Sequence, residues 1–206
     1  MYARTRVFSA LLVMVLAIMT MTTSGTVIAE SDSCKVTGDA GESMSDIIDR
    51  FSRLQILQFG RGPGPTDEWR EAPITRGGFA VLLVRALGYE QDALISKEDT
   101  PFSDMAEHWA AGHVTILARQ GLVQGQPGGM FEPDEPLTLP QAQVILARTL
   151  RARATITMEN AEQALQSAGM ETRIPCEQLV VNQGQAMLLL DRAMRIPIYA
   201  RHNLDE

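Results

Sequence analysis

The chain has 206 residues, of which 45% are hydrophobic and 21% are charged, and it carries a formal net charge of −7 at pH 7. These fractions are those of an ordinary globular protein, and they exclude a disordered tail, a fibre and a protein with several membrane spans. The acidic balance argues against nucleic acid as a partner, because a nucleic-acid-binding surface is usually basic.

The first 29 residues are typical of a secretory signal peptide. Arg4 and Arg6 precede an apolar stretch over residues 7–21, and a short polar segment then leads to Ala29. The stretch has 15 residues, fewer than the roughly 20 that span a bilayer, so cleavage is favoured over an uncleaved membrane anchor. We expect an exported mature chain of residues 30–206. Its net charge is −9, because removal of the signal takes away two arginines and no acidic residue.

The mature chain keeps two cysteines, Cys34 and Cys176, which lie 142 positions apart. Export brings them into an oxidising compartment, where an even number of cysteines favours a disulfide. A bridge would tie the N-terminal segment to the C-terminal third and stabilise the fold by about 4–5 kcal/mol in the chain-entropy description. The alternative is two separate buried thiols.

Three segments share the apolar stripe of a helix that buries one face. The first stripe runs from Phe79 to Leu87. The pattern recurs 63 residues later, from Ala142 to Leu150, and a further 44 residues later, from Ala186 to Met194. The same register repeats a helix cap and an arginine; the caps are Thr75, Thr138 and Asn182, and the arginines are Arg85, Arg148 and Arg192. We expect these arginines to brace contacts between repeats.

A second helix is predicted before each stripe. The clearest covers residues 109–123, where Gly121 suits the left-handed residue that ends a helix. Matching apolar patterns occur at residues 47–57 and 161–170. Chain dense in glycine and proline, which predicts loops, separates the two helices over residues 60–73 and 125–136.

The pattern therefore predicts an all-α fold of three helix–loop–helix units, at about residues 44–90, 101–152 and 156–200. A unit of this size cannot bury both of its helices alone, so the three should pack together. A compact pseudo-threefold bundle, forming a single domain over residues 30–206, is the simplest closed arrangement.

The middle unit carries a series of spaced motifs: Phe102-Ser103-Asp104, His108-Trp109-Ala110, Gly121-Leu122-Val123, Gly125, Gly129, Phe131, Pro133 and Leu137-Thr138. They resemble the S-layer homology (SLH) domains, whose members read F-x-D, H-W-A, G-L/I-V/I-x-G, G-x-F-x-P and L/I-T-R-A-E. The T-R element of the first unit is Thr75-Arg76. The resemblance covers residues 73–152, and the internal repeat extends it over residues 44–200.

The resemblance implies a three-repeat helical prism that attaches exported proteins non-covalently to the cell envelope. Its ligands would be wall-linked polysaccharides, often with acidic pyruvyl groups, or peptidoglycan, held in grooves between repeats. The implied ligand-binding residues are Arg76, Asp104, Trp109, Thr75, Gly125 and Gly129. A guanidinium offers paired donors to a carboxylate, an indole offers a flat apolar face to a sugar, and glycines allow close backbone approach. In so acidic a chain, anion binding must rest on local sites.

The other copies lack parts of this set. The arginine position of the T-R element holds Leu139 in the second copy and Gln183 in the third, and the tryptophan position holds no aromatic residue in either remaining unit. One groove, formed by Arg76, Asp104 and Trp109, therefore keeps the complete set. Each of the three also has a purely structural interpretation, as a solvated helical arginine, an N-cap and a core aromatic.

The sequence holds no catalytic motif of the H-E-x-x-H, G-x-S-x-G, phosphate-loop or C-x-x-C type, so we predict no enzyme. His108, His113 and His202 lack metal-ligand spacing, and we expect neither metal nor cofactor. The sequence leaves two alternative functions. One is a module that binds an envelope polysaccharide or peptidoglycan at the cell surface or in the periplasm. The other is a non-catalytic scaffold there that contacts another envelope protein.

Overall fold

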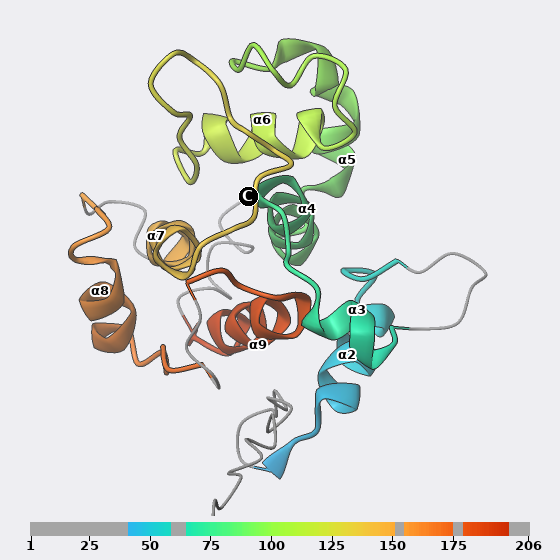
Figure 1. Ribbon diagram of the computed structural model, residues 1–206, viewed down its shortest axis with the longest axis vertical. Helices are drawn as coiled ribbons and strands as arrows, with labels where there is room; N and C mark the ends of the chain where they lie inside the picture. Colours follow the sequence, from blue (N-terminus) through green and yellow to red (C-terminus); the bar gives the residue numbers. More distant parts are fainter. Residues whose placement is uncertain (1–40, 59–64, 151–154, 175–178, 198–206) are drawn as a thin grey trace, which may run out of the picture. The chain divides into compact units, whose positions relative to one another are not determined.

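The computed structural model describes residues 41–58, 65–150, 155–174 and 179–197, which belong to a compact unit of residues 35–206 (Figure 1). The described residues form eight α-helices and a short 3-10 helix, and their β pairing is limited to isolated bridges. The all-α prediction is confirmed for this part of the chain. None of the described helices is long and apolar enough to cross a membrane. The expected signal peptide, Cys34 and Cys176 lie outside the described residues, so cleavage and the disulfide stay predictions.

In the first unit and the link after it, the described residues form α2 (Met44–Arg53), α3 (Asp67–Glu71), α4 (Arg76–Ala86), α5 (Glu90–Ile95) and the 3-10 helix η2 (Lys97–Asp99). The loop prediction for residues 60–73 is wrong where α3 forms. Thr66 caps α3 by accepting a hydrogen bond from the Trp69 N–H at 3.2 Å, and acidic residues in its first turn complement the helix dipole.

The second unit contains α6 (Ala111–Arg119) and α7 (Leu139–Leu150), and the third contains α8 (Ala161–Ser167) and α9 (Gln183–Met194). The predicted helix over residues 109–123 ends early, at Arg119. Gly121 takes a φ of +69°, and the Leu122 N–H donates back to the Leu117 carbonyl at 2.8 Å. That hydrogen bond belongs to a Schellman-type C-cap, so the helix-ending role of Gly121 is confirmed.

The predicted starts of α4, α7 and α9 are confirmed by side-chain caps. The Thr75 hydroxyl accepts from the N–H three residues later at 3.0 Å. Thr138 and Gln141 exchange hydrogen bonds of 3.4 and 3.0 Å, and Asn182 and Gln185 exchange hydrogen bonds of 2.8 and 3.0 Å. These contacts satisfy N–H groups that a helix start leaves without partners, so the local sequence determines where each of these helices begins.

The extended segments before α4, α7 and α9 hydrogen-bond to one another in a closed ring. The Ile74 N–H donates to the Val181 carbonyl at 3.0 Å, the Val181 N–H to the Leu137 carbonyl at 2.9 Å, and the Leu137 N–H to the Ile74 carbonyl at 2.9 Å. A second set links Arg76 to Glu135, Leu139 to Leu179 and Gln183 to Ala72. Within each set the positions are offset by 63 and 44, as in the apolar stripes. The ring joins equivalent points of the units, and the threefold packing of complete units stays a prediction.

Helix α9 is buried on nearly every face, although its sequence predicts a single buried stripe. All ten residues from Gly184 to Ala193 are buried, because α9 packs against α2, α3, α4 and α7. A helix with neighbours on so many sides also buries polar residues. Asp191 is 4% exposed, and its carboxylate lies 2.7 Å from Nη2 of Arg50 on α2. Contacts between distant elements therefore decide the burial of this helix.

Candidate functional site

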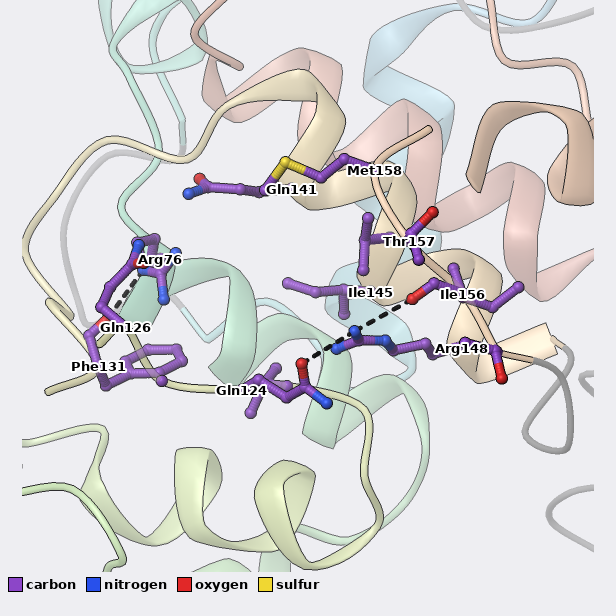
Figure 2. A pocket seen from close by; sticks show the side chains of 14 residues that line it. Arg76, Gln124, Gln126, Phe131, Gln141, Ile145, Arg148, Ile156, Thr157 and Met158 are labelled. Carbon is purple, nitrogen blue, oxygen red and sulfur yellow. Dashed lines mark hydrogen bonds between the residues drawn. The ribbon is translucent and has the colours of Figure 1, made fainter. Parts of the chain in front are cut away.

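A cavity of about 470 Å³ lies between the start of α4, the chain after α6, one face of α7 and residues 155–158 (Figure 2). It is lined by Arg76, residues 123–126, Phe131, four residues of α7 (Gln141, Val144, Ile145 and Arg148) and residues 155–158. Its volume is within the range of small-molecule sites. Arg76 lies 47 residues before the rest of the lining, which falls within residues 123–158, so the tertiary fold brings distant parts of the chain together at the pocket.

The pocket is cationic although the chain is acidic. The described residues that line it include two arginines, three glutamines and two threonines but neither aspartate nor glutamate, whereas the whole chain has a net charge of −7. The apolar part of the lining consists of Val123, Phe131, Val144, Ile145, Ile156 and Met158. An apolar surface with a few converging polar groups is the usual composition of a ligand-binding site.

Arg76 reaches the pocket from the first turn of α4. Its Nε donates to the Phe131 carbonyl at 2.9 Å, and its guanidinium carbon lies 4.6 Å from the centre of the Phe131 ring. Burial lowers the pKa of Arg76, and the carboxylates of Glu132 and Asp104 oppose this shift; arginine stays protonated in proteins. Within the described chain, Nη1 and Nη2 have no hydrogen-bond partner, so both can donate to a ligand.

Asp104 holds the loop that carries Phe131 and does not line the pocket. Its two carboxylate oxygens accept from the backbone N–H groups of Phe131 and Glu132, at 2.8 and 2.7 Å. Desolvation would raise the pKa of Asp104, but these hydrogen bonds outweigh it and the pKa lies below its usual value. Asp104 therefore caps backbone groups of the 131–132 loop, and through that loop it positions the ring beneath Arg76.

Trp109 is 61% exposed and is not part of the pocket lining. Its ring centre lies 5.2 Å from that of His108, whose Nε2 is 3.3 Å from an oxygen of Asp134. The interpretation of Trp109 as a core aromatic is wrong, because Ala110 and Ala111, which follow it, take the fully buried positions at the start of α6. The structure thus brings Arg76 to the pocket and leaves Trp109 on the surface outside it.

Thr75 and the two predicted glycines shape the chain around the pocket. Thr75 is the N-cap of α4 and thereby orients the next residue, Arg76. Gly125 lines the pocket, and a Cβ at this position would lie 2.6 Å from the Phe102 ring, so a larger residue does not fit. Gly129 has a φ of +77°, a conformation that glycine adopts without the steric cost other residues incur.

The repeated arginines hold the loop that follows the first helix of their own unit, whereas the sequence predicted braces between repeats. Arg85 donates to the Ile56 carbonyl at 3.5 Å and Arg192 to the Arg173 carbonyl at 2.6 Å, while Arg148 donates to the side-chain oxygen of Gln124 at 3.2 Å. Among these three, Arg148 also lines the pocket, which the sequence reasoning missed. The sequence signal for this role is a spacing of i, i+3, i+4 and i+7, which places Gln141, Val144, Ile145 and Arg148 on one helix face.

Comparison with known proteins identifies the middle repeat. Residues 101–142 match the family model of the S-layer homology domain, which confirms the resemblance that the motifs of the middle unit predicted. This domain and the names of the relatives place the chain among proteins of the cell envelope or cell surface. Among the described residues, no three potential metal-binding side chains group together.

Three relatives illustrate the similarity. A "Cell surface protein" of Thermoanaerobacter kivui is 29% identical over 71% of this chain and 20% of its own length. A "Surface layer protein" of Brevibacillus choshinensis is 34% identical over 48% of this chain and 9% of its own. A "Cellulosome-anchoring protein" of Acetivibrio thermocellus is 33% identical over 33% of this chain and 15% of its own. The chain thus spans a fifth or less of each of these relatives.

Proposed function

We propose that this protein attaches non-covalently to the cell envelope by binding an acidic wall polysaccharide or peptidoglycan in the pocket at Arg76. The observation that carries the proposal is the charge of the pocket: its described lining residues include two arginines and no carboxylate, in a chain of net charge −7. The S-layer homology domain supports it, as do relatives named for the cell surface and for cellulosome anchoring.

The lining residues have complementary roles in this proposal. The Nη1 and Nη2 groups of Arg76, which have no hydrogen-bond partner among the described residues, form a planar pair of donors that matches a carboxylate. Ile145 and Phe131 offer apolar surface to the C–H groups of a sugar ring, and Gln126 and Gln141 can exchange hydrogen bonds with its hydroxyls. The role is binding without catalysis.

Co-sedimentation of the full chain with purified cell-wall sacculi tests this function. We expect the wild type to sediment with the sacculi, and R76Q to lose at least tenfold in affinity because a charge-assisted hydrogen bond is removed. R119Q is the matched control, since Arg119 is an exposed arginine paired with Asp99 at 2.8 Å and lies outside the pocket. Circular dichroism confirms folding of each variant. Equal retention of R76Q and R119Q would refute a pocket-based attachment.

W109A separates the pocket from the exposed indole. If a ligand extends from the pocket over the surface that carries Trp109, W109A weakens sedimentation and R76Q weakens it further. Sedimentation that depends on Trp109 and not on Arg76 would move the binding surface away from the pocket.

The scaffold alternative is favoured by a separate observation, an exposed apolar pair on α5. Leu94 is 62% exposed and Ile95 is 81% exposed, and large apolar side chains on a surface are frequent in protein–protein contacts. Under this alternative the wild type does not sediment with sacculi, and an L94D/I95D variant loses a protein partner from the envelope.

A further inference from the structure

The two arginines of the pocket differ in how their charge is compensated. Arg76 is near the carboxylates of Glu132 and Asp104, which raise its pKa. Among the described residues, no carboxylate raises the pKa of Arg148, and burial shifts that pKa downward. Within the described residues it makes no ion pair, so its positive charge is partly removed from water without a partner. A cation in that state gains the most from an anionic ligand.

Arg85, the equivalent arginine of the first unit, has the carboxylate partner that Arg148 lacks within the described residues. Arg85 pairs with Glu90, with its Nε 3.1 Å and its Nη2 3.3 Å from the two carboxylate oxygens. In the sequence, the offset of 63 that relates the two helices carries Glu90 to Arg153, so the second unit has an arginine where the first has the neutralising acid. Arg148 therefore repeats the loop contact that Arg85 makes, but its unit has no acid at the sequence position equivalent to Glu90.

Arg148 also keeps donors available. Both of its hydrogen bonds come from Nη2, at 3.2 Å to the side-chain oxygen of Gln124 and 3.2 Å to the Ile156 carbonyl. Nε and Nη1 have no hydrogen-bond partner in the described part of the chain. Figure 2 shows Arg76 beside Phe131 and the guanidinium end of Arg148 beside Ile145 and Gln124, so the two guanidinium groups lie at separate places in the pocket lining.

We infer that Arg148 is a second ligand-contacting residue, which makes the pocket selective for an oligosaccharide segment with two separate carboxylates, one at Arg76 and one at Arg148. This inference rests on the proposed binding of an acidic wall polymer and specifies its chemistry. The apolar surface between the arginines would contact the sugar ring that joins the two anionic groups. A ligand with one carboxylate would satisfy only one guanidinium and leave the other uncompensated.

Isothermal titration calorimetry with two defined probes tests the inference. Digalacturonate carries two carboxylates on adjoining sugar rings, and galacturonate carries one. We expect the full-length wild type to bind digalacturonate at least tenfold more tightly than galacturonate, because the second carboxylate adds a charge-assisted hydrogen bond. In R148Q this preference falls to threefold or less, and R148K, which keeps the charge, retains a preference above that of R148Q.

R85Q is the matched control for the structural brace. It removes the equivalent arginine of the first unit, which does not line the pocket, and it should retain the wild-type preference for digalacturonate. No preference in the wild type, including binding of neither probe, overturns the inference. Equal preference in R148Q and the wild type overturns it as well, and so does an equal loss in R85Q, which would reveal a purely structural effect.

Co-sedimentation with sacculi, run in parallel, separates this inference from the proposed function. A wild type that sediments with sacculi but does not distinguish the two probes refutes the role of Arg148 and leaves wall attachment standing. A wild type that fails to sediment refutes wall attachment itself, whatever the calorimetry shows.

Discussion

Replacing Asp104 should destabilise the protein through the loop that it holds. Its carboxylate accepts two backbone hydrogen bonds, from Phe131 at 2.8 Å and Glu132 at 2.7 Å, and D104A removes both acceptors. At roughly 1–2 kcal/mol for each hydrogen bond to a partly exposed charged group, D104A should lower the free energy of unfolding by about 2–4 kcal/mol. D104N keeps one acceptor oxygen and should cost about half as much.

Urea unfolding followed by circular dichroism measures these changes. The effect should also depend on pH, because hydrogen bonds to the ionised carboxylate hold the pKa of Asp104 below its ordinary value of 3.8. A lowered folded-state pKa contributes stability that is fully present above the unfolded-state pKa and is lost as the pH falls through the folded-state pKa. The difference between the wild type and D104N should therefore be largest near neutral pH and shrink in strong acid.

D99N is the control, because Asp99 is 68% exposed in its ion pair with Arg119 and exposed pairs contribute little to stability. If D104A costs no more than D99N, the two hydrogen bonds do not hold the loop. A difference between the wild type and D104N that stays constant into strong acid would refute the role of the ionised carboxylate. D104N should also weaken sedimentation with sacculi, since Phe131 lies beneath Arg76.

Three further changes test the fold and the site. G125A should cost about 1–3 kcal/mol in urea unfolding, because its Cβ would lie 2.6 Å from the Phe102 ring; a cost below 0.5 kcal/mol would refute that close approach. N182A, which removes the capping box of α9, should lower stability by about 1 kcal/mol, and an unchanged urea midpoint would contradict this. Burial lowers the pKa of His113 below 6.5, so the contribution of His113 to stability is lost as the pH falls through the folded-state pKa. H113Q should therefore flatten the decline of thermal stability in mild acid. An unaltered decline would show that another group causes it.

Short-range patterns in the sequence were enough to locate the ends of the repeated helices. The caps at Thr75, Thr138 and Asn182 and the left-handed Gly121 act within a few residues, so their effects are visible without any tertiary contact. The short helix α3 was missed because the surrounding glycines and prolines outweighed its Thr66 cap in a composition-based prediction.

The candidate site was only partly predictable. The family motif led to Arg76 and Gly125, which line the pocket, and also to Asp104 and Trp109, which do not. A motif shows that a residue has a role, but it does not distinguish a side chain that faces a ligand from one that holds a loop. Arg148 was assigned only to the brace, since its second role depends on which surface of α7 the neighbouring segments leave open.

The sequence by itself determined the helical class, the three copies and their offsets of 63 and 44, because stripes and caps depend on residues close together along the chain. The tertiary structure alone decided how those copies meet: the ring of hydrogen bonds through Ile74, Leu137 and Val181, the burial of α9 from Gly184 to Ala193, and the gathering of Arg76 and Arg148 in one pocket whose described lining has no carboxylate. These features depend on contacts between residues tens of positions apart, and no local pattern encodes which distant groups become neighbours.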